Sequence, residues 1–185
     1  MRALGLDEVW WLVSPGNPLK DDASDMAPLK ARAASAVVMA RRAPIRVSAI
    51  ESEFGTRYTV DTLRKLVARF PQQRFVWLMG ADNLEDFHQW RDWRGIAALV
   101  PIAVIGRPGY EGPTQAVRAM GWLRRCVHRP GLAKQWTRWS LPALLILRLP
   151  PDPSSATAIR MADPDWYRSD FPQAMRDMVT HRRIR

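Results

Sequence analysis

The chain has 185 residues, of which 47% are apolar, and it carries 28 lysine and arginine residues against 18 aspartates and glutamates, a formal net charge of +10. This length favours one domain with its own core, residues 1–185. The single cysteine, Cys126, excludes an internal disulfide, and no apolar run is long enough to cross a bilayer, so we expect a soluble protein of the reducing cytoplasm.

Short apolar segments alternate with stretches of helical period, which is typical of a parallel sheet covered by helices. The candidate strands are almost entirely apolar, which indicates burial on both faces, and they are residues 9–13, 45–50, 75–79, 101–105 and 144–149. Helices are expected at 25–42, 59–70, 82–96 and 165–182, with a short one at 114–125. The pattern predicts an α/β fold with a doubly wound parallel sheet.

Two of these helices carry recognisable start signals. Asp25 can cap the first, with Pro28 tolerated in its first turn. Thr59 is the expected N-cap of the second, Asp61 lies in its first turn, and Pro71 ends it.

A basic segment follows the fourth strand. From Arg107 to Arg148 there are eight basic side chains and one acid, Glu111, with tryptophans interleaved. Such a composition suits a nucleic-acid surface, but it also suits a solvated insertion whose tryptophans pack on the domain. We favour the insertion, because no nucleic-acid-binding motif accompanies the charge.

The third strand ends in Gly80, and Asp82 follows. Ligands of open α/β sheets bind at the carboxyl ends of the strands. A glycine there lets a ribose or phosphate approach the main chain, and an aspartate can accept hydrogen bonds from a ribose diol. These two residues are therefore candidates for nucleotide binding.

Three other places suit a phosphate. Lys20, in a loop after the first strand, is either a point charge for a phosphate or solvated surface. Arg107 follows a strand and either pairs with a phosphate or begins the basic segment. Residues 154–160 place small hydroxyl side chains at an expected helix start, followed by Arg160.

In their order and spacing, residues 75–84, 87–93, 104–110 and 154–160 resemble the nicotinate-mononucleotide adenylyltransferases. The resemblance implies a Rossmann-like nucleotidyltransferase fold. It also implies adenylyl transfer from ATP to nicotinate mononucleotide, giving nicotinate-adenine dinucleotide and pyrophosphate in NAD biosynthesis, with Mg²⁺ accompanying ATP.

The resemblance also implies residue roles. ATP binding is expected at Gly80, Asp82, Ser155, Thr157, Arg160 and Lys20, and substrate binding at Tyr58, Thr59, Trp90, Arg91 and Arg107. Backbone amides near Thr59 and at Arg91 would donate hydrogen bonds to the nicotinate carboxylate, and Trp90 would stack on the nicotinate ring. Trp93 is expected in the core. Ala156 replaces a serine of the family pattern, which removes one hydroxyl contact.

The family's His-x-Gly-His element and Gly-Gly-Ser-Phe-x-Pro loop are not found in this sequence, so no catalytic residue and no protein metal ligand is assigned. Residues 1–10 match the end of the family's first helix and its second strand. We therefore expect a chain shortened at its start, lacking the first strand of the sheet, and both poorly stable and inactive by itself. Upstream codons should encode roughly 20 to 30 residues that contain both motifs.

Two other functions remain open. A pantetheine-phosphate adenylyltransferase is disfavoured because the elements at Tyr58, Thr59 and Trp90 belong to the pyridine branch of the resembled enzymes. A nucleotide- or nucleic-acid-binding module without catalysis is the alternative from another class. The expected partners are ATP and nicotinate mononucleotide, without nucleic acid or membrane.

Overall fold

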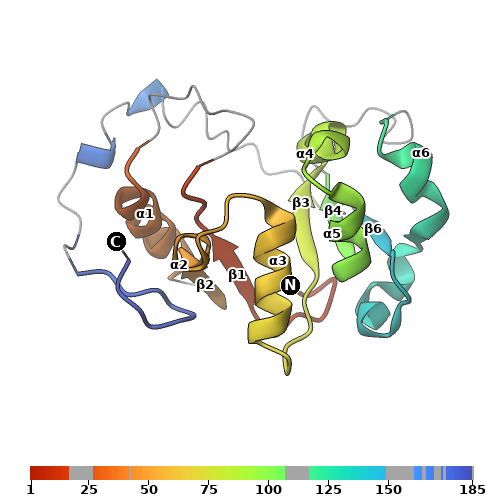
Figure 1. Ribbon diagram of the computed structural model, residues 1–185, viewed down its shortest axis with the longest axis horizontal. Helices are drawn as coiled ribbons and strands as arrows, with labels where there is room; N and C mark the ends of the chain where they lie inside the picture. Colours follow the sequence, from red (N-terminus) through yellow and green to blue (C-terminus); the bar gives the residue numbers. More distant parts are fainter. Residues whose placement is uncertain are drawn as a thin grey trace. The chain divides into compact units, whose positions relative to one another are not determined.

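The computed structural model describes residues 1–16, 27–41, 43–106, 117–148, 161–163, 166–168, 172 and 174–184. All five predicted strands are present (Figure 1). In chain order the elements are β1 (Val9–Leu12), α1 (Leu29–Ala40), β2 (Ile45–Ser48), α2 (Ile50–Phe54), α3 (Thr59–Arg69), β3 (Trp77–Gly80), α4 (Ala81–Asp86), the 3-10 helix η2 (Phe87–Gln89), α5 (Trp93–Leu99), β4 (Ile102–Ile105), α6 (Met120–Leu123), η4 (Arg124–Cys126), β5 (Val127–His128), η5 (Pro130–Arg138), β6 (Leu144–Leu147) and η6 (Trp166–Arg168).

Among the described residues every strand pairing is parallel, which confirms the predicted α/β class. In the part of the chain that the structure describes, the strands form two sheets, one of order β1-β2 and one of order β3-β4-β6-β5. The chain divides into two compact units, one formed by Met1, Leu6–Arg57 and Ser154–Arg185 and the other by Arg2–Gly5 and Tyr58–Pro153. The expectation of a single domain stays a prediction.

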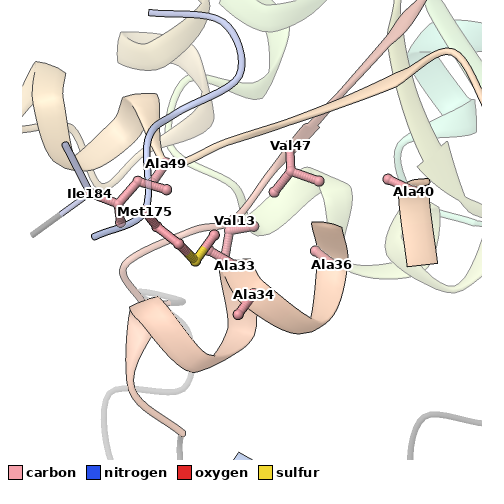
Figure 2. Close-up of a cluster of buried hydrophobic side chains, with 9 residues drawn as sticks. All are labelled: Val13, Ala33, Ala34, Ala36, Ala40, Val47, Ala49, Met175 and Ile184. Carbon is pink, nitrogen blue, oxygen red and sulfur yellow. The ribbon is translucent and has the colours of Figure 1, made fainter. Parts of the chain in front are cut away.

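In the first unit, α1 packs on the small sheet through alanines (Figure 2). Small side chains let the helix approach the strands closely, but each buries little apolar area. Ala33 and Ala40 of this helix are buried. The cluster consists of Val13, Ala33, Ala34, Ala36, Ala40, Val47, Ala49, Met175 and Ile184.

Arg32 lies on the same helix and is partly buried. Its Nε donates to the Ala27 carbonyl at 2.8 Å and its Nη1 to the Ser14 carbonyl at 2.6 Å. Burial lowers the pKa of the Arg32 guanidinium, which nevertheless stays protonated at neutral pH. The side chain therefore ties the segment after β1 to the residues just before α1.

The predicted helix over 165–182 is wrong in the described residues. Residues 174–184 contain a turn and an antiparallel bridge between Arg176 and Arg183, and only Trp166–Arg168 is helical, as a 3-10 turn. The reason lies in Asp177, whose buried carboxylate accepts from the backbone N–H groups of Val179 and Thr180 at 2.8 and 3.0 Å. Such local side-chain bonds compete with the helical pattern.

Helix boundaries also differ from the sequence prediction. Tyr58, not Thr59, is the N-cap of α3, and neither side chain caps the helix. Pro28 occupies the N-cap position of α1, and Asp25 lies outside the described residues. The predicted stretch 82–96 is divided into α4, η2 and α5, because Asp92 adopts the left-handed region with φ 46°.

The second unit has its core on the four-stranded sheet. Residues 102–104 of β4 and 144–145 of β6 are fully buried, together with Phe87, Ile96 and Leu123 from the covering helices. Among the described residues, no helix has the length and apolarity needed to cross a membrane.

The tryptophans of the basic segment pack within this unit, as the favoured interpretation expects. The buried Trp136 donates from Nε1 to the Leu4 carbonyl at 2.9 Å. The Trp139 ring stacks on His128 at 3.9 Å. The short helix expected at 114–125 is present as α6 and η4, with residues 114–116 outside the described ranges.

Candidate functional site

The carboxyl edge of the larger sheet carries the predicted nucleotide-binding pair. Gly80 ends β3 opposite Ile105 of β4, which in turn lies opposite Leu147 of β6, so three strands end level with one another. Asp82 follows in the first turn of α4 and is half-buried. This arrangement delivers a backbone and a carboxylate to the edge where parallel sheets bind ligands.

Five predicted site residues lie outside the described ranges. They are Lys20, Arg107, Ser155, Thr157 and Arg160. Their roles stay predictions.

The start of α3 presents free amides. The backbone N–H groups of Asp61 and Thr62 both donate to the Tyr58 carbonyl, at 3.0 and 3.1 Å. Among the described residues, no hydrogen-bond acceptor contacts the amides of Thr59 and Val60. Unpaired N–H groups at a helix start, aided by the helix dipole, bind anions such as carboxylates.

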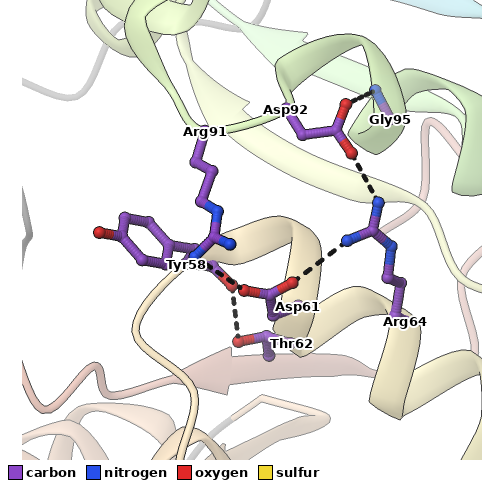
Figure 3. A network of polar contacts seen from close by, with 7 residues as sticks. All are labelled: Tyr58, Asp61, Thr62, Arg64, Arg91, Asp92 and Gly95. Atoms are coloured by element: carbon purple, nitrogen blue, oxygen red, sulfur yellow. Dashed lines mark hydrogen bonds and ion pairs between the residues drawn. The ribbon is translucent and has the colours of Figure 1, made fainter.

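The loop Trp90–Asp92 lies against this helix start (Figure 3). The Arg91 guanidinium carbon is 4.6 Å from the centre of the Tyr58 ring, a cation–π contact. Its Nη1 lies 3.7 Å from Oδ2 of Asp61. The fold therefore brings Tyr58, Thr59 and Arg91 together although they are separated by more than a helix and a strand.

Trp90 is half-buried between aromatic neighbours. Its ring meets the Trp77 ring edge-on at 6.5 Å and the Phe87 ring at 5.5 Å. Trp93 contacts the same Phe87 ring at 5.7 Å and the Trp122 ring at 5.3 Å. The two tryptophans do not lie on one helix as the expected helix over 82–96 would place them, because η2 ends before Trp90 and α5 begins at Trp93.

Two neighbours of this site, Arg64 and Asp92, were not predicted as site residues, and Asp61 was predicted only as a charge in the first turn of a helix. Asp61 and Arg64 are three residues apart on α3, a spacing that predicts an ion pair. No sequence signal places Asp92 beside Arg64, since the contact depends on how α5 packs on α3.

No cluster of three or more histidine, cysteine, aspartate or glutamate side chains that could hold a metal ion occurs in the described ranges. A protein-held metal centre therefore has no support among these residues.

Comparison with known proteins gives consistent similarities. A family profile described as cytidylyltransferase-like matches residues 1–162. The chain is 59% identical over 189 aligned residues to the "Probable nicotinate-nucleotide adenylyltransferase" of Erythrobacter litoralis (strain HTCC2594), covering 100% of this chain and 84% of that protein. A protein of the same name from Parvibaculum lavamentivorans (strain DS-1 / DSM 13023 / NCIMB 13966) is 52% identical, covering 86% of this chain and 79% of the relative.

A solved structure shares the fold. It is "Plasmodium falciparum nicotinic acid mononucleotide adenylyltransferase complexed with APC", with a TM-score of 0.57 and 13% identity, covering 86% of this chain and 72% of the other. At this identity the likeness concerns the arrangement of the elements alone.

Proposed function

The chain belongs to the cytidylyltransferase-like family, and from this membership we propose that it is a nicotinate-nucleotide adenylyltransferase. The reaction joins the phosphate of nicotinate mononucleotide to the adenylyl group of ATP and releases pyrophosphate, a step in the synthesis of NAD. The observation that carries the proposal is the 59% identity that extends over the whole chain.

The geometry at the start of α3 supports the pyridine substrate. The free amides of Thr59 and Val60 suit the nicotinate carboxylate, which is a charge-assisted acceptor. Tyr58 and Arg91 lie beside these amides, and Trp90 offers an aromatic surface from the same loop. We assign Tyr58, Thr59, Trp90 and Arg91 to the mononucleotide, together with Arg107 outside the described residues.

The sheet edge suits the adenylyl donor. Gly80 and Asp82 lie at the carboxyl end of β3, where a nucleotide can approach the main chain and offer its ribose diol to a carboxylate. We assign ATP to these two residues and to Lys20, Ser155, Thr157 and Arg160 outside the described ranges. The protein's contribution to the rate would be to hold the two phosphates in line and to stabilise the developing charge.

Mg²⁺ enters this proposal as the ion that accompanies the phosphates of ATP. The described residues offer no protein cluster for it. There it would neutralise charge on the phosphates, and we assign it no protein ligand.

The proposal is tested by ligand binding. Binding is measured before catalytic turnover because residues 1–185 lack the His-x-Gly-His element. We expect ATP to raise the melting temperature and nicotinate mononucleotide to raise it further, since each binds the folded state. Nicotinamide mononucleotide, which lacks the carboxylate, is the matched control and should give a smaller shift. The pantetheine-phosphate alternative predicts a shift with 4′-phosphopantetheine instead.

The nucleic-acid alternative predicts a different response. No shift with the mononucleotide, together with a salt-dependent shift by any oligonucleotide, would overturn the enzyme proposal in favour of a binding module.

A further inference from the structure

We propose that Asp61, Arg64 and Asp92 are positioning residues of the mononucleotide site. They hold the loop Trp90–Asp92 against the start of α3, so that Arg91 stays over the Tyr58 ring. The inference rests on the function proposed above, because it assigns a task to residues that surround the same site.

The first observation is a continuous chain of ion pairs (Figure 3). Arg64 donates from Nη1 to Oδ1 of Asp61 at 3.2 Å and from Nη2 to Oδ2 of Asp92 at 2.6 Å. The other oxygen of Asp61 lies 3.7 Å from Nη1 of Arg91. One guanidinium thus bridges two carboxylates, and one carboxylate faces two guanidinium groups. The planar fork of arginine is suited to such bridging.

The second observation is the conformation of Asp92. Its backbone has φ 46° and ψ 46°, a left-handed conformation that L-residues other than glycine seldom adopt and that aspartate and asparagine tolerate best. Its Oδ1 accepts from the Gly95 backbone N–H at 3.1 Å, which caps α5. The two oxygens of Asp92 therefore have different tasks, one starting α5 and the other reaching α3 through Arg64.

Gly95 is matched to this arrangement. A Cβ atom on Gly95 would lie 2.3 Å from Oδ2 of Asp92, the oxygen that contacts Arg64. Any side chain at position 95 would therefore force the carboxylate to move.

Because these charged groups are exposed, losing their ion pairs should affect the position of the loop more than the stability of the fold. The Arg64 side chain is 52% exposed, Asp92 46% and Arg91 61%. Exposed ion pairs contribute about 0 to 1 kcal/mol each, so their loss should change the unfolding free energy little. What their loss changes is the placement of the loop, and a displaced loop moves Trp90 and Arg91, which we assign to the mononucleotide.

The sign of the effect of removing Asp61 distinguishes positioning from simple attraction. Asp61→Asn removes a negative charge beside Arg91, so electrostatic attraction alone predicts tighter binding of the anionic mononucleotide. Positioning predicts weaker binding. Arg64→Gln removes a positive charge, and both explanations predict weaker binding for it. The two variants together therefore separate the explanations.

Titration calorimetry on the whole chain tests the proposal. We expect Asp61→Asn and Arg64→Gln each to raise the Kd for nicotinate mononucleotide roughly 5- to 30-fold and to leave the Kd for ATP unchanged. Arg64→Lys should recover part of the affinity, because an ammonium group does not span both carboxylates as a guanidinium does. Matched controls are Glu85→Gln and Arg124→Gln, which remove exposed charges elsewhere on the same unit and should change neither Kd.

Melting temperatures guard against misfolding and should stay within about 2 °C of wild type. Tighter or unchanged mononucleotide binding by Asp61→Asn, or equal weakening of ATP and mononucleotide, would overturn the positioning role alone. Failure of the wild-type chain to bind nicotinate mononucleotide would overturn the proposed function and this inference with it.

Discussion

The buried Phe87 ring is the common neighbour of Trp90 and Trp93, two tryptophans to which we assign different roles. We expect Trp90→Ala to weaken nicotinate mononucleotide binding by roughly 1 to 3 kcal/mol, the scale of one lost stacking contact, with little effect on ATP. Trp93→Ala is the matched change. It removes ring contacts with Phe87 and Trp122, so it should lower the unfolding free energy by about 3 kcal/mol. Calorimetry and urea denaturation of both variants supply the two readouts.

An equal loss of ATP and mononucleotide affinity in Trp90→Ala, or a loss of stability alone, would show that the two tryptophans are wrongly assigned.

Asp177 is a buried carboxylate of the first unit with several hydrogen bonds. It is 4% exposed and accepts from Ser48 Oγ at 2.8 Å and from the Ala49 amide at 2.7 Å, besides its bonds to the amides of Val179 and Thr180. Asp177→Ala leaves these buried donors without a partner, which should cost about 2 to 5 kcal/mol of unfolding free energy. Asp177→Asn keeps one acceptor oxygen and should lose less.

The matched control for this site is Asp163→Ala, an exposed carboxylate outside the bonded cluster, which urea denaturation should show to be near neutral. Wild-type stability in Asp177→Ala would contradict the account given for the C-terminal segment.

At the scale of elements, the Asp92 carboxylate that caps α5 depends on the absence of a side chain at Gly95. Replacing a glycine inside a helix by alanine ordinarily stabilises it by about 1 kcal/mol. In Gly95→Ala this gain is opposed by the loss of the Asp92 cap, worth about 1 kcal/mol, because the new Cβ displaces the carboxylate. We expect a nearly unchanged melting temperature together with weaker nicotinate mononucleotide binding, measured by calorimetry.

Gly121→Ala is the corresponding control. It lies on the helix α6 of the same unit, and a Cβ there meets nothing within 4 Å. This variant should be neutral or slightly stabilising with unchanged binding. A large loss of stability in Gly95→Ala without loss of affinity would show that Asp92 serves only the helix.

At the scale of the whole molecule, the two units differ in how much they bury. The β1-β2 sheet has two strands backed mainly by alanines, whereas β4 lies between β3 and β6 and is almost wholly buried. Two-stranded sheets are marginal by themselves. We expect hydrogen exchange to show an opening free energy for the β4 amides that exceeds that of β1 by about 2 kcal/mol or more. Equal protection of both sheets would show that the units open together.

The sequence by itself determined the strands and the amphipathic helix α3. Near-continuous apolar runs at β4 and β6 leave the chain little choice but burial, and α3 has apolar residues at helical spacing with Asp61 in its first turn. The helix start near Thr59 was also predicted from sequence, whereas Trp90 and Arg91 were expected on a helix and lie between η2 and α5. These signals are local, so residues close in the chain carry them.

Tertiary structure alone decided what depends on distant partners. The segment after residue 173 favours a helix by its own pattern. Asp177, however, hydrogen-bonds to Ser48 and Ala49, 129 and 128 residues away, and these bonds stabilise a turn instead. Asp92 breaks a predicted helix where its carboxylate meets Arg64, 28 residues earlier. The physical reason is the same in both cases: a carboxylate satisfies its hydrogen bonds with whatever the fold brings near it, and sequence spacing does not encode that neighbour.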